Sequence, residues 1–107
     1  MSNIARDIPV ELDADGFLAH PEEWNELIAS QLAERDGIGP LTDAHWSVIQ
    51  SLRKHYYSSG GIPPLRHVCV ENNLEPHCVP QLFKDTGREL WRIAGLPNPG
   101  EEAKTYL

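Results

Sequence analysis

The sequence predicts a mainly α-helical single domain with a small β-hairpin at its N-terminus and a flexible C-terminal arm. Apolar residues recur at helical spacing through much of residues 21–94. They alternate with other residues near the N-terminus, which is typical of a strand. The 107 residues, 40% of them hydrophobic, suffice for one modest core. We expect residues 1–97 to form the domain, with the hairpin at about 4–18 and helices at about 21–94, and residues 98–107 to form a mobile tail.

The hairpin is predicted from a short stretch at the start of the chain. Residues 8–12 alternate between apolar and other side chains. Residues 13–16 read Asp-Ala-Asp-Gly, and the Asp-Gly pair is a turn signal. Phe17 and Leu18 would begin the returning strand. Because two strands alone are only marginally stable, this hairpin should lie against helices.

The first helix is expected to open at Pro21, which suits the first helical turn. The acidic Glu22 and Glu23 would lie near its positive end, and Gly37 would follow its last turn. Its apolar stripe consists of Trp24, Leu27, Ile28 and Leu32.

Two more helices follow. Thr42 can cap the second, and Ser-Ser-Gly-Gly at residues 58–61 terminates it. Pro63-Pro64 opens a shorter third helix, with Cys69 on its apolar face. The predicted core of the domain is Trp24, Leu27, Ile28, Trp46, Ile49, Leu52, Leu65, Val68 and Ile93.

A short helix near Pro80 and a last helix complete the prediction. Residues 86–89, Thr-Gly-Arg-Glu, have the pattern of a capping box. Gly95 suits the position just after the last helix, and Pro97 and Pro99 prevent its continuation. The residues after them should therefore project clear of the domain in a restricted direction.

The net charge of −7 is unevenly spread along the chain. Residues 1–52 hold ten acidic and two basic side chains, and residues 53–92 hold six basic and four acidic ones. A possible basic strip consists of Arg53, Lys54, His55, Arg66 and His67. We do not expect DNA binding, because the strip is short and the pI is about 5.1.

No apolar run is long enough to span a membrane, and the N-terminus has no apolar signal segment. Cys69 and Cys78 are the two cysteines, and we interpret them as reduced thiols of a cytoplasmic protein. Cys69 should be buried and Cys78 more accessible. A disulfide between them stays open, because spacing gives no distance. Together with His67 and His77 they match no zinc pattern, so we expect no metal and no cofactor.

Several strings in the chain point to one known family. Arg92-Ile-Ala-Gly-Leu-Pro-Asn-Pro99 resembles the tail of the DsrC/TusE family, which includes the gamma subunit of dissimilatory sulfite reductase. Leu41-Thr-Asp-Ala-His-Trp-Ser-Val-Ile49 is similar to an internal string of that family, in which His45 packs or caps rather than catalyses. The turn at residues 13–18 also resembles the family. The resemblance covers nearly the whole chain.

The resemblance implies a helical bundle with a helix-turn-helix-like core and an arm that carries reactive cysteines. Trp91 and Glu102 stand at the two places where such cysteines occur. Cysteine-bearing members accept sulfur from TusBCD/DsrEFH-type sulfurtransferases. They pass it into tRNA 2-thiouridine synthesis, or they serve as the protein co-substrate of dissimilatory sulfite reductase. Some members have been proposed to bind DNA.

The absence of a cysteine after Cys78 means that the tail cannot carry sulfur, because a persulfide needs a thiol. We therefore predict a non-catalytic partner-binding or regulatory homologue, although the family's sulfurtransferase-type carriers leave enzyme activity open. One alternative is a sulfur carrier that uses Cys78 or Cys69, and another is a DNA-binding regulator. The predicted partner-binding residues are Arg92, Ile93, Gly95, Leu96, Pro97 and Pro99.

Overall fold

The computed structural model describes residues 10–84 and 87–107, apart from the side chain of Tyr106. This part of the chain is mainly helical, as predicted, with five α-helices and two short 3-10 helices. In chain order they are η2 (Pro21–Glu23), α1 (Glu26–Arg35), α2 (Asp43–Ser59), α3 (Leu65–Glu71), α4 (Cys78–Phe83), α5 (Gly87–Ile93) and η3 (Ala103–Tyr106). No helix among these is long and apolar enough to cross a membrane.

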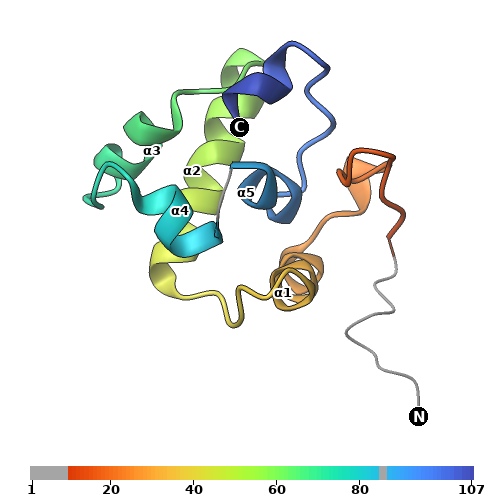
Figure 1. Ribbon diagram of the computed structural model, residues 1–107, viewed down its shortest axis with the longest axis horizontal. Helices are drawn as coiled ribbons and strands as arrows, with labels where there is room; N and C mark the ends of the chain where they lie inside the picture. The colour runs from red at the N-terminus through yellow and green to blue at the C-terminus, as the bar shows by residue number, and fades with distance from the viewer. Residues whose placement is uncertain (1–9, 85–86) are drawn as a thin grey trace.

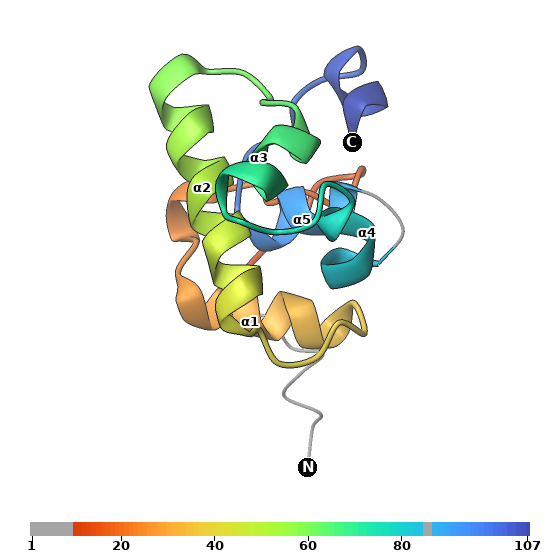
Figure 2. The same cartoon turned by 90° about the vertical axis from the view of Figure 1, so that its left-hand side faces the viewer.

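The centre of the molecule is α5. Figure 2 places it between the long α2 and the shorter α4, and both figures show α1 below it and the last residues of the chain above (Figures 1 and 2). Leu90, Trp91, Ile93 and Leu96, in and just after α5, are all fully buried. Burying one large apolar side chain stabilises a fold by about 1.5–3 kcal/mol, so this short helix contributes much of the core.

The predicted N-terminal hairpin is wrong for the described residues, which contain no strand. Leu12 and Leu18 form one isolated antiparallel bridge, and residues 4–9 of the predicted hairpin lie outside the described residues. The turn between them is held by the Asp13 side chain, whose Oδ1 accepts hydrogen bonds from the backbone N–H groups of Asp15 and Phe17. A carboxylate that binds the local backbone in this way favours a turn over a longer ladder.

The first α-helix begins later than predicted. Pro21 opens only the 3-10 helix η2, and α1 starts after Asn25, whose side chain accepts the N–H of Ile28 at 2.9 Å. This shift corrects the predicted stripe. Leu27 is 65% exposed and lies outside the core, whereas Ala29 and Ala33 are buried beside Ile28 and Leu32.

The predicted cap of α2 is confirmed, and it includes a buried histidine. The Thr42 hydroxyl accepts the N–H of His45, and the Thr42 N–H donates to His45 Nδ1 at 3.0 Å. The other ring nitrogen, Nε2, lies 2.9 Å from the carbonyl oxygen of Leu82 just before the end of α4. Because Nδ1 accepts a hydrogen bond, Nε2 carries the ring proton and donates a hydrogen bond to that oxygen. His45 is thus confirmed as a capping residue.

The remaining helices begin close to their predicted places. Gly60 ends α2 in the left-handed conformation, and α4 starts at Cys78, two residues before Pro80. The predicted cap at Thr86 lies outside the described residues. Of the predicted core, Ile28, Ile49, Leu52, Val68 and Ile93 are buried, while Trp24, Trp46 and Leu65 pack partly buried against it.

Candidate functional site

The candidate site is the segment that follows α5, together with the surfaces that hold it. Gly95 has a φ of +73° just beyond the helix. Its N–H donates to the carbonyl oxygen of Arg92, and the N–H of Leu96 donates to that of Trp91. These two bonds form the Schellman motif, so the predicted role of Gly95 is confirmed.

The carbonyl groups at the end of α5 are bound by side chains from two other parts of the chain. The Trp24 indole Nε1 donates to the oxygen of Ile93 at 2.7 Å, and Arg53 Nη1 donates to that of Ala94 at 2.6 Å. The Arg53 guanidinium also lies 3.8 Å from the centre of the Trp24 ring. A cation above an indole and two hydrogen bonds to helix-end carbonyls fix the direction in which the chain leaves α5.

Trp91 is part of the core and not of an accessible arm. Its side chain is fully buried and meets the Tyr56 ring edge-on, with centroids 5.5 Å apart. Its Nε1 donates to the carbonyl oxygen of Pro97 at 2.7 Å. The residue at the position that the resemblance assigns to a reactive cysteine therefore anchors the start of the tail.

Arg92 connects α5 to two separate loops. Its Nε donates to the oxygen of Gly16 at 2.6 Å, and its Nη1 binds Asp36 Oδ2 at 2.7 Å. The side chains of the ion pair are 18% and 11% exposed, so solvent screens it less than a surface pair. Arg92 is thus occupied inside the molecule.

The predicted partner-binding set is divided by burial. Ile93, Gly95 and Leu96 are buried, whereas Pro97 and Pro99 are partly exposed. A partner can meet the two prolines on the folded protein but can reach the first three only if the end of α5 opens. Recognition by this set stays a prediction, and the accessible portion begins at Pro97.

The tail does not project clear of the domain in this structure, contrary to expectation. Lys104, only 8% exposed, lies 2.9 Å from both Asp15 Oδ2 and Glu101 Oε1. Asn98 donates to the same Asp15 oxygen at 2.7 Å. Leu107 ends beside Gly87 at the start of α5. Pro97 and Pro99 restrict the direction in which the chain leaves α5, but these polar contacts hold the tail against the surface of the domain. Its mobility stays a prediction.

We expect Asp15→Asn to loosen the tail. The hydrogen bond from Lys104 holds the pKa of Asp15 below its ordinary value, with a further contribution from Asn98. A lowered pKa means that the contact is present at neutral pH and is lost as the pH falls through that pKa. Hydrogen exchange of residues 101–107 should therefore be faster in Asp15→Asn at neutral pH. Glu102→Gln, at an exposed side chain, is the matched control. Equal exchange in the two variants would show that Asp15 does not hold the tail.

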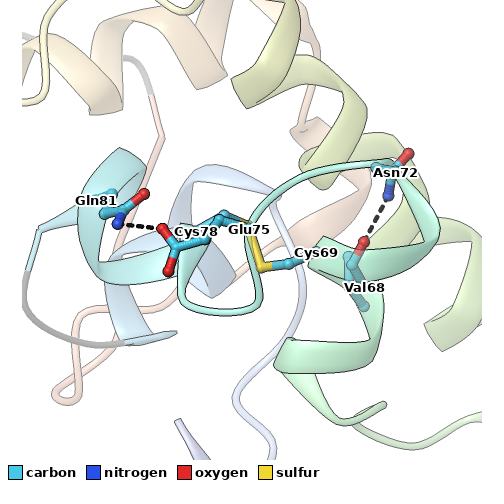
Figure 3. Close-up of a disulfide and its surroundings, with 6 residues drawn as sticks. All are labelled: Val68, Cys69, Asn72, Glu75, Cys78 and Gln81. Carbon is cyan, nitrogen blue, oxygen red and sulfur yellow. Dashed lines mark hydrogen bonds between the residues drawn. A yellow bond between two sulfur atoms is a disulfide. The ribbon is translucent and has the colours of Figure 1, made fainter.

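The two cysteines form a disulfide, so the prediction of reduced thiols is wrong for this structure. Cys69 near the end of α3 and Cys78 at the start of α4 are joined with Sγ atoms 2.08 Å apart and Cα atoms 5.8 Å apart (Figure 3). Cys69 is fully buried as predicted, but Cys78 is only 2% exposed, which corrects its predicted accessibility. Neither sulfur can meet a partner without reduction and local opening.

The turn between the two cysteines is closely held. The backbone N–H of Leu74 donates to the carbonyl oxygen of Cys69 at 3.0 Å, and the backbone N–H of Cys78 donates to the carbonyl oxygen of Glu75 at 3.0 Å. The side-chain amide of Asn72 donates a hydrogen bond to the carbonyl oxygen of Val68, and that of Gln81 donates one to the Glu75 carboxylate (Figure 3). These bonds bring α3 and α4 together, which spacing alone could not establish.

The residues of the predicted basic strip have different surroundings. Arg53 points to the end of α5, while His55 and His67 both contact the carboxylate of Glu71. Glu71 Oε1 lies 2.8 Å from His55 Nε2, and this contact holds the pKa of Glu71 below its ordinary value. A strip made of all five residues would therefore be interrupted by a negative charge. The expected absence of DNA binding stays a prediction.

Comparisons with known proteins agree on one family. The model of the family described as "DsrC like protein" matches residues 5–101. Sulfurtransferase TusE of Sodalis glossinidius is 32% identical over 98 residues, which cover 84% of this chain and 90% of that protein. The Haemophilus influenzae sulfurtransferase TusE homolog is 34% identical over 103 residues, covering 88% and 93%.

Solved structures give the same result. The oxidized gamma subunit of the dissimilatory sulfite reductase (DsrC) from Archaeoglobus fulgidus is similar with a TM-score of 0.69 and 37% identity, over 84% of this chain and 89% of the other. The DsrC/gamma subunit of Pyrobaculum aerophilum is similar with a TM-score of 0.72 and 34% identity, over 86% and 85%.

Proposed function

The chain belongs to the DsrC/TusE family, and from this membership we propose that it serves a sulfur relay or a sulfite reductase system by binding protein partners, without carrying sulfur on its tail. The observation that carries this proposal is Trp91. It has no nucleophile, it is fully buried, and its indole binds the segment that leads into the tail. No residue after Cys78 offers a thiol.

The proposed partners are a TusBCD/DsrEFH-type sulfurtransferase complex or a sulfite reductase in the cytoplasm, met through the accessible tail. The buried end of α5 around Gly95 is followed by four exposed residues, Asn98, Gly100, Glu101 and Glu102. A surface retained without its thiol would let this protein occupy the place of a cysteine-bearing carrier. It would then act as a regulator, and it would not be an enzyme.

The test compares the full chain with a truncation that ends at Asn98. This truncation keeps the hydrogen bond between Trp91 and Pro97 and removes Lys104. The contacts at the end of α5 therefore stay while the tail is lost. Both forms are titrated into either partner complex, with and without the cysteine-bearing carrier. We expect tail-dependent binding that excludes the carrier. Equal binding by both forms, or simultaneous binding with the carrier, would refute a tail-mediated competitor.

A second candidate function is a sulfur carrier that uses the cystine between Cys69 and Cys78. The names of the relatives favour it, because they are sulfurtransferases. Disulfides of cytosolic proteins are also usually transient and catalytic or redox-sensing. A dithiol reductant would first supply two electrons and two protons to give both thiols. The Cys78 thiolate would then attack the outer sulfur of a donor persulfide, releasing the donor thiolate.

Mass spectrometry after incubation with a persulfide donor separates the two candidates. The reduced protein should gain no sulfur on residues 91–107, and Cys78 should not deliver sulfur to an acceptor protein. Rapid loading of Cys78 and transfer onward, absent in Cys78→Ser, would favour the carrier. Slow loading without transfer is the ordinary behaviour of a thiol that becomes exposed, and it does not favour the carrier.

A further inference from the structure

A compact group of possible metal ligands lies on the side of the molecule where α2 meets α3. His67 and Glu71 are one helical turn apart on α3, so their side chains share a face. His55 reaches the same carboxylate from α2. The Nε2 atoms of His55 and His67 lie 2.8 and 3.3 Å from one oxygen, Glu71 Oε1, and the ring centroids are 6.0 Å apart.

We propose that His55, His67 and Glu71 form a binding site for a divalent transition metal ion of the Zn²⁺ type. Their three ligand atoms lie within 4.8 Å of one another. Zn²⁺ binds imidazole nitrogen and carboxylate oxygen at about 2.0–2.2 Å, so two ligand atoms of a tetrahedral ion are about 3.3 Å apart. The distances from Glu71 Oε1 to the two imidazole nitrogens, 2.8 and 3.3 Å, are at or below this value, so the ligands have to move apart only slightly to surround an ion.

The neighbouring side chain favours the orientation that binding needs. Ser51, also on α2, donates its hydroxyl to the second oxygen of Glu71 at 3.0 Å. This bond holds one carboxylate oxygen and leaves Oε1 facing the two imidazoles. Second-shell hydrogen bonds of this kind commonly orient metal-binding carboxylates.

The composition and exposure of the group indicate which metals it suits. Two nitrogens and one oxygen fit Zn²⁺ and its transition-metal neighbours, whereas Mg²⁺ and Ca²⁺ prefer oxygen alone. The side chains of His55, Glu71 and His67 are 34%, 35% and 62% exposed. Water can therefore complete the coordination, and an ion can enter from solvent. Lys54 lines the same hollow as Glu71, and its positive charge there opposes the binding of a cation.

This set differs from the one that the sequence suggested. The sequence pattern groups His67 with Cys69, His77 and Cys78, and no metal is expected at that group. The disulfide removes both cysteines from that set, and the packing of α3 on α2 supplies His55 and Glu71 instead. The inference needs no sulfur chemistry and no partner, so it is independent of the proposed function.

The test is a calorimetric titration of ZnCl₂ into the full chain, prepared without a polyhistidine tag and with the disulfide verified by intact mass. We expect one ion per molecule. His55→Ala, His67→Ala and Glu71→Gln should each weaken binding at least about tenfold. His77→Ala is the matched control, because this exposed histidine lies outside the group, and it should bind like the unaltered protein.

Circular dichroism of each variant separates a lost ligand from a lost fold, and His67→Ala, at the most exposed of the three, is the decisive variant. Zn²⁺ binding that His67→Ala leaves unchanged would overturn the site. So would a loss as large in His77→Ala, or no binding at submillimolar Zn²⁺ by the unaltered chain.

Discussion

Gly95→Ala is expected to destabilise the protein by about 2–5 kcal/mol, measured by chemical denaturation. Gly95 has a φ of +73°, a left-handed conformation that costs other residues about 1–2 kcal/mol. A β-carbon would also overlap Cγ and Cδ1 of Trp24 and lie 2.7 Å from the Trp24 Cβ. These atoms cannot yield easily, because the Trp24 indole is bound to Ile93 and covered by Arg53.

A matched control separates backbone strain from the collision. Gly60 ends α2 with a φ of +79°, and a β-carbon there would meet nothing within 4 Å. Gly60→Ala should therefore cost only about 1–2 kcal/mol. In a double-mutant cycle, Trp24→Ala should remove part of the additional cost of Gly95→Ala. Equal destabilisation by the two alanines would contradict the close contact between Gly95 and Trp24.

Trp91→Ala is expected to cost about 3–5 kcal/mol in the free energy of unfolding. The substitution leaves a cavity beside Tyr56 in the centre of the core. It also removes the donor that binds the carbonyl oxygen of Pro97. Trp91→Phe keeps most of the volume and lacks the indole N–H, so it should cost less while still loosening the segment after Leu96.

The same pair of variants tests the assignment of Trp91 to the core. Thermal unfolding gives the stability, and hydrogen exchange at the amides of Asn98 and Gly100 gives the order of the following segment. We expect Trp91→Ala to affect both measurements, and Trp91→Phe to affect mainly the second. A loss below about half a kcal/mol in Trp91→Ala, typical of surface substitutions, would show that this position is not a core position.

The sequence was most informative where a local rule determines the structure. Thr42 and His45 form the cap at the start of α2, and Gly95 precedes two prolines just after α5. The start of α2 and the end of α5 could therefore both be predicted. The stripe of the first helix was misjudged because Trp24 was counted as helical. Asn25 captures the backbone of Ile28 and starts the helix later, which turns Leu27 outward.

Features that depend on distance could not be predicted from spacing. The approach of Cys69 to Cys78 depends on the turn between α3 and α4. The pairing of His67 with Glu71 is visible as a one-turn spacing, but the arrival of His55 needs the packing of two helices. Likewise, nothing local indicates that Lys104 returns to Asp15 near the other end of the described chain.

The burial of Trp91 gives the protein an optical reporter. Indole emission responds to the polarity of its surroundings, and this indole is buried away from water while its N–H binds Pro97, the residue just before the tail. A partner that pulls on Pro97 should alter that emission, and the spectrum of Trp91→Phe isolates the Trp91 component from Trp24 and Trp46. The fluorescence of this buried indole thus allows partner binding at the tail to be followed without an attached dye.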